Sequence, residues 1–141
     1  MASTVSKRII EAIDALPLRP GMRVLEIGCG PGVAAREIVH RYPDAFVLGI
    51  DRSATAIRQA LAGSRQEVDL GQLGFRVAAA ESFALQAGES PFDLAFALRV
   101  GAFDGRHPEA GRMALPRVAA ALVPGGRFFI DGGSPLRELQ T

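Results

Sequence analysis

Apolar positions along the chain alternate between helical spacing and short continuous runs, which indicates helices that alternate with buried strands. Val5, Ile9, Ile13 and Leu16 recur at helical spacing and predict an amphipathic helix over residues 4–16. Further helices are predicted over 31–40, after Ser53 as a cap, and over 109–122. Strands are predicted over 23–27, 46–50, 75–79, 92–98 and 127–130. This alternation predicts an α/β protein with a mostly parallel sheet and right-handed helical crossovers.

Sheets of this kind bind ligands beyond the carboxyl ends of their strands, where the strand order reverses. The residues that follow Ile27, Ile50, Ala79 and Leu98 are therefore the candidates for a functional site.

Composition narrows the class of protein. The 141 residues, 48% hydrophobic and 22% charged, are expected to form one domain. A net charge of +1 argues against nucleic acid or an acidic membrane as the main partner. A single cysteine excludes a disulfide within the chain. The chain shows neither a signal peptide nor an apolar stretch of about 18 residues, so a cytoplasmic protein is expected.

A glycine-rich loop follows the first predicted strand, within the sequence VLEIGCGPG. Gly28, Gly30 and Gly32 allow positive φ and let a ligand lie against the main chain, close to the amides of the next helix. The alternative is that these glycines only satisfy the geometry of a tight turn. The dinucleotide-binding fingerprint requires a glycine where this chain has Val33. Glu26 would also repel a pyrophosphate, whereas it suits a ligand that carries positive charge.

Residues 26–32 resemble the E/D-x-G-x-G-x-G motif of the class I S-adenosylmethionine-dependent methyltransferases. Three further segments are similar to later motifs of that family: 49–51 to the end of its second strand, 92–94 to the start of its fourth, and 122–127 to its L-x-P-G-G turn. The resemblance extends over residues 22–131.

The resemblance implies S-adenosylmethionine as cofactor and S-adenosylhomocysteine as product. The residues that it places at the cofactor are Glu26, Gly28, Cys29, Gly30, Asp51, Arg52, Ala80, Glu81 and Leu98. Asp51 would hold the ribose hydroxyls and Glu26 the methionine end. The alternatives are that Asp51 helps to cap the next helix, that Glu26 satisfies loop amides, and that Arg52 is a solvated surface residue.

Two positions of this predicted cofactor site, the segment after the third strand and Cys29, have special features. The family commonly has an acidic residue after the third strand for the adenine amino group, and this chain has alanines over 78–80. Glu81, Ser82 or backbone groups around Ala80 are the candidates for that contact. Cys29 is interpreted as a residue required for backbone geometry and not as a reactive thiol, because no matched base is evident.

The acceptor side is expected in the loop after the fourth strand, where Arg99, Asp104 and His107 are candidate substrate-binding residues. His107 is either a proton acceptor or an exposed loop histidine, and no catalytic residue or metal ligand is assigned. The sequence thus predicts methyl transfer to a small molecule. The alternatives are a non-catalytic protein that binds S-adenosylmethionine or S-adenosylhomocysteine, and a nucleotide-dependent oxidoreductase.

The short chain affects the predicted architecture. The resemblance implies a three-layer, Rossmann-like, doubly wound sheet, here with about five strands in order 3-2-1-4-5, because the family's final hairpin has no room. One domain is expected: a helix at 1–20 that covers the site, a core at 21–131 and a tail at 132–141. The fifth strand would then be an apolar edge. We expect either a homodimer through this edge or its cover by the N-terminal helix or the tail.

Overall fold

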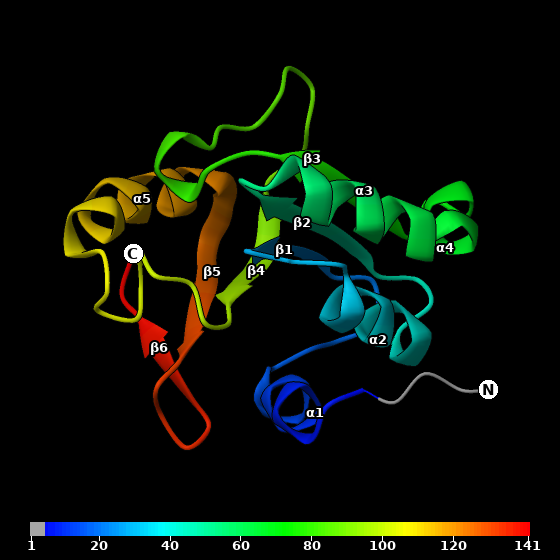
Figure 1. Cartoon of the computed structure of the whole chain (residues 1–141), viewed down its shortest axis with the longest axis horizontal. Coiled ribbons are helices and arrows are strands. Elements are labelled where there is room, and N and C mark those ends of the chain that lie inside the picture. The colour runs from blue at the N-terminus through cyan, green and yellow to red at the C-terminus, as the bar shows by residue number, and fades with distance from the viewer. Residues whose placement is uncertain (1–4) are drawn as a thin grey trace.

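Six strands form one sheet in the order β3-β2-β1-β4-β5-β6 in the computed structural model, which describes residues 5–141 (Figure 1). The strands are β1 Arg23–Ile27, β2 Phe46–Asp51, β3 Leu73–Val77, β4 Phe92–Ala97, β5 Leu122–Asp131 and β6 Leu136–Leu139. The helices are α1 Lys7–Ala15, α2 Val33–Arg41, α3 Ala54–Gly63, α4 Arg65–Asp69, α5 Pro108–Ala121 and the 3-10 turn η1 Ala80–Ser82. Neighbours from β3 to β5 pair in parallel, which confirms the predicted fold class.

Alternate residues of the central strands face opposite sides of the sheet and build two cores. Val24 of β1 packs with Ile13 of α1 and Ile38 of α2 on one side. Leu25 packs with Val118 of α5 on the other side. Both faces of the sheet are thus covered, and this explains why the central strands read as continuous apolar runs. Figure 1 shows α1 and α2 on the side of the sheet away from α5.

Several boundaries differ from the sequence-based predictions. Thr4, at the start of the first predicted helix, lies outside the described residues, and α1 begins after its cap Ser6. The third strand covers Leu73–Val77 and not 75–79. Leu73 is buried and pairs with Val47, whereas residues 78–80 leave the sheet. Ala78 and Ala79 are apolar, but they lie outside β3.

The chain after β5 corrects a second expectation. β6 pairs with β5 in antiparallel fashion, from Phe128 opposite Leu139 to Asp131 opposite Leu136. Arg127 and Glu138 form an ion pair across the two strands at 2.8 Å. The fifth strand is therefore not the sheet edge, and the predicted alternative that the tail covers it is confirmed. A homodimer is thus not needed to cover β5.

None of the helices within residues 5–141 combines the length and the apolar character that a membrane span requires.

Candidate functional site

The glycine loop after β1 is bound to the end of β2. The backbone amides of Gly28 and Cys29 both donate to the Ile50 carbonyl, at 2.8 and 3.0 Å. Gly28 has a φ of 70°, and a Cβ there would lie 2.6 Å from Val100 Cγ2. Gly30 has a φ of 54°, and a Cβ there would meet no protein atom within 4 Å. Gly28 is thus required for close packing, and Gly30 faces open space in which a ligand has room.

Asp51 joins this loop to the start of α3. Its Oδ2 accepts a hydrogen bond from the Gly30 amide and its Oδ1 accepts one from the Ser53 amide, both at 2.9 Å. Ser53 itself caps α3, because its hydroxyl accepts from the Ala56 amide. Each carboxylate oxygen keeps a further lone pair. Asp51 can therefore fix the loop and still accept hydrogen bonds from a ligand.

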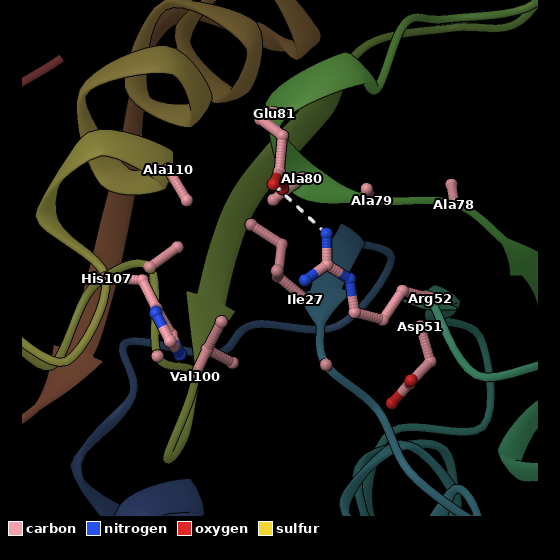
Figure 2. Close-up of a pocket in the computed structure, with 13 residues that line it drawn as sticks. Ile27, Asp51, Arg52, Ala78, Ala79, Ala80, Glu81, Val100, His107 and Ala110 are labelled. Atoms are coloured by element: carbon pink, nitrogen blue, oxygen red, sulfur yellow. Dashed lines mark hydrogen bonds and ion pairs between the residues drawn. The ribbon is translucent and has the colours of Figure 1, made fainter.

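A first cleft opens beside Asp51, with about 510 Å³ of empty space including the part open to solvent. Its walls come from the ends of β1 and β2, from η1, and from the segment between β4 and α5. Figure 2 shows the Arg52 guanidinium directed toward Glu81, with which it forms an ion pair at 3.1 Å. His107 and Val100 lie on the opposite side of the cleft (Figure 2). Ala80 also lines the cleft and is buried.

A second cavity borders the glycine loop and shares Gly28 with the first cleft. Glu26, Cys29 and Leu98 line it, together with Arg8 and Ile9 of α1. The two spaces thus meet at Gly28, at the carboxyl ends of the central strands.

Glu26 contributes a buried carboxyl group to this second cavity. Its side chain is 4% exposed, and its Oε1 has no hydrogen-bond partner among the described residues. Burial, and next the Asp51 charge, raise the pKa of Glu26 to about 8, while the Arg36 charge opposes this rise. An unpaired buried carboxyl oxygen is unfavourable unless a ligand group pairs with it.

The Cys29 side chain points from the glycine loop onto Gly49 of β2. A Cβ at Gly49 would come within 2.8 Å of the Cys29 Cβ, so the two residues are in close contact. Burial, and next the charges of Glu26 and Asp51, raise the pKa of the thiol. The thiol is thus held in its protonated form, which agrees with the interpretation that Cys29 serves backbone geometry.

The three acceptor-side candidates do not line one cleft, although Arg106 connects two of them by binding the Asp104 carboxylate and the Arg99 carbonyl. His107 lines the first cleft. Asp104 pairs with Arg106 at 2.7 Å and lines a separate depression with Asp131. Arg99 has a φ of 56°, and its amide donates to Asp131. Arg8 also lines the second cavity and was not among the predicted site residues. The predicted helix over residues 4–16, which contains Arg8, was the one sequence feature that pointed to it.

This sheet order, with a glycine loop after β1 and a carboxylate at the end of β2, defines a Rossmann-like protein with a candidate nucleotide site. The family model described as "Methyltransferase domain" matches residues 24–126. The chain belongs to this methyltransferase domain family, which confirms the resemblance seen in the sequence.

The comparisons also find named relatives. A trans-aconitate 2-methyltransferase of Paracidovorax citrulli is 34% identical over 121 residues, which are 86% of this chain and 42% of the relative. This chain therefore spans less than half of that protein.

Solved structures have the same fold. A methyltransferase from Geobacter sulfurreducens, in complex with S-adenosylhomocysteine, matches 89% of this chain and 47% of its own, with a TM-score of 0.68 and 21% identity. A phosphoethanolamine N-methyltransferase of Haemonchus contortus, in complex with S-adenosylmethionine, matches 88% of this chain and 27% of its own, with a TM-score of 0.69 and 25% identity.

Proposed function

We propose that this protein is an S-adenosylmethionine-dependent methyltransferase that acts on a small-molecule acceptor by direct methyl transfer. The observation that carries the proposal is the pair of spaces that flank Gly28, one beside Asp51 and the other beside Glu26. Adenosine would occupy the first and the amino-acid end of the cofactor the second.

The residues present fit this cofactor. Asp51 has free lone pairs for the ribose hydroxyls, Gly30 leaves room for the ligand, and the unpaired Oε1 of Glu26 can accept from an ammonium group. Arg52 and Glu81 frame the adenine end. We propose that either Glu81 or backbone groups near Ala80 contact the adenine amino group.

The cofactor, when bound, supplies an electrophilic methyl group on a sulfonium. The protein must then align the acceptor with that methyl group and exclude water, and such positioning contributes several kcal/mol, about 7 or more in well-oriented cases. His107 lines the cleft, and we propose that it contacts the acceptor. Arg99 and Asp104 do not line this cleft, and we propose that they contact parts of the acceptor that extend beyond it.

The proposed class of acceptor is based on the substrate that a relative's name gives. The relative at 34% identity is a trans-aconitate 2-methyltransferase, an enzyme that acts on a small carboxylic acid. We therefore propose a small organic acid as the acceptor, and a catalytic protein in preference to one that only binds the cofactor. Transfer of a labelled methyl group to trans-aconitate and related acids tests this part. Cofactor binding without transfer to any acceptor would favour the binding-only alternative.

Cofactor binding is tested first. S-adenosylhomocysteine should raise the melting temperature of the protein, and NAD should not. Asp51→Ala should weaken S-adenosylhomocysteine binding at least about tenfold in calorimetry, which corresponds to about 1.4 kcal/mol. Asp44→Ala is the matched control, because Asp44 is exposed and precedes the start of β2, whereas Asp51 lies at the end of that strand beside the loop. Equal affinities of the wild-type protein and Asp51→Ala would remove Asp51 from the site.

A further inference from the structure

The glycine loop has a further attachment that does not involve β2. The Arg36 guanidinium of α2 donates from Nη1 to the Pro31 carbonyl at 2.8 Å. The same nitrogen donates to the Ser64 hydroxyl oxygen, also at 2.8 Å. Ser64 lies at the junction of α3 and α4, 28 residues further along the chain than Arg36. One guanidinium thus connects the loop with the α3–α4 junction.

Ser64 uses its hydroxyl for this contact and not for its own helix. It is the N-cap residue of α4, and a serine oxygen at that position usually accepts from an amide of the first helical turn. The Ser64 side chain makes no such bond to α4. It is also fully buried, and a buried hydroxyl is unfavourable without a hydrogen-bond partner. The serine at this junction therefore serves Arg36.

Two glycines leave room for the guanidinium. A Cβ at Gly32 would lie 3.0 Å from the Arg36 Nη1, and a Cβ at Gly63 would lie 3.2 Å from the same atom. Both distances are shorter than ordinary van der Waals contact. The half-buried Arg36 side chain therefore lies in a narrow space whose walls are the glycine loop and the end of α3.

A second contact joins the same helices but does not reach the loop. His40 lies one turn after Arg36 on α2, and its Nε2 is 2.8 Å from the Glu67 Oε2 of α4. This hydrogen bond lowers the pKa of Glu67. The packing of α2 against α4 thus has a link of its own. What Arg36 adds is the bond to Pro31.

We propose that Arg36 is a positioning residue of the cofactor site, which ties the Pro31 carbonyl to Ser64 so that the α3–α4 junction sets the conformation of the glycine loop. The proposal rests on the proposed function. The Gly30 amide is bound to Asp51, and the next carbonyl along the chain, that of Pro31, is bound to Arg36. Neither Arg36 nor Ser64 lines the two spaces that meet at Gly28. A change at Ser64 should therefore alter cofactor affinity without removing a ligand contact.

Calorimetry with S-adenosylhomocysteine, well below the melting temperature of each variant, tests this role. Arg36→Gln should weaken binding about fivefold or more, because the ligand must then order the loop itself. Ser64→Ala should weaken it about two- to threefold, since the bond to Pro31 remains. The double variant should bind as Arg36→Gln does, because both changes break one contact. Arg36→Lys should restore part of the affinity, since an ammonium group can still donate to one of the two oxygens.

The pH profile of binding is a readout that a purely structural role would not change. The Arg36 charge lowers the pKa of Glu26, and the Asp51 charge raises it. Arg8 and the Cys29 thiol are the other titratable groups at the cavity of Glu26. In Arg36→Gln the loss of the charge should raise the pKa of Glu26 further. The increase of S-adenosylhomocysteine affinity with pH should then occur at higher pH, whereas Arg36→Lys should keep the wild-type profile.

His40→Ala is the matched control, because it removes the other contact between α2 and α4 and leaves Pro31 bound to Arg36. This variant should bind S-adenosylhomocysteine as the wild type does. Wild-type affinity of Arg36→Gln, or an equal loss of affinity in His40→Ala, would overturn the proposal. A weaker Arg36→Gln with the wild-type pH profile and no recovery in Arg36→Lys would also overturn it, since that result shows a structural role only. If the wild-type protein does not bind S-adenosylhomocysteine, the proposed function itself fails.

Discussion

Glu26 shows how a single buried carboxyl group responds to its place in the fold. It lies at the inner end of the glycine loop, 4% exposed, and faces the charge of Asp51. Burial raises the pKa of this carboxyl group well above its usual range. An ammonium group beside it would favour the ionised form. The residue is therefore suited to a positively charged ligand group and is strained without one.

The pH dependence of stability provides a test at this position. The pKa of Glu26 rises from 4.5 to about 8 on folding. Below pH 4.5 the carboxyl group is protonated in the folded and in the unfolded protein. As the pH rises from 4.5 through about 8, the unfolded protein releases this proton before the folded protein does, so the free energy of unfolding falls over this range. Without cofactor, Glu26→Gln should thus match the wild type at pH 4 and exceed it by about 2 kcal/mol or more at pH 9. Urea denaturation across this range measures the difference, and a constant difference would contradict the pKa shift.

At the scale of elements, the β1 loop and the β2 strand beneath it use glycine for different reasons. Gly30 has positive φ and faces open space. Gly49 lies in β2, where a Cβ would come within 2.9 Å of Cys29 Sγ and of Phe75 Cδ1. One glycine therefore keeps space for a ligand, and the other allows the loop to pack on the sheet.

Alanine at each glycine should separate these two roles. Gly49→Ala should lower the free energy of unfolding by about 1–3 kcal/mol through overpacking. Gly30→Ala should cost about 1 kcal/mol for its backbone conformation. The free energy of S-adenosylhomocysteine binding by Gly30→Ala should fall by more than its free energy of unfolding does. The reason is that the added methyl group enters the space in which the ligand would lie. Denaturation and calorimetry on both variants check this, and full cofactor binding by Gly30→Ala would contradict it.

At the scale of the whole molecule, the carboxyl-terminal strand closes one side of the sheet. Leu136 and Leu139 pack against opposite cores, and β6 supplies backbone partners to β5. Phe128 of β5 is fully buried, since β5 lies between β4 and β6 and Phe128 belongs to the core that includes Val118 of α5. The sheet therefore ends in a short strand that carries charges, which is a common protection against edge-to-edge pairing.

Removal of this strand should expose β5. A variant that lacks residues 134–141 should self-associate or aggregate, and light scattering should show a larger mass than for the chain with β6. Glu138→Ala is the control, because it removes the ion pair with Arg127 and leaves the backbone pairing intact. A truncated variant whose mass equals that of the parent chain would show that β6 does not protect the edge.

The sequence by itself determined the parallel sheet, the glycine loop and the position of Asp51, because periodicity and local turn chemistry act over a few residues. Glu26 was also found in this way, since it adjoins the loop. The tertiary structure alone decided that Arg8 reaches the cavity, since this depends on how Ile13 packs with α2. It also decided that Arg52 pairs with Glu81, which lies 29 residues further along the chain. Contacts of this kind depend on the orientation of whole elements, which local patterns do not encode.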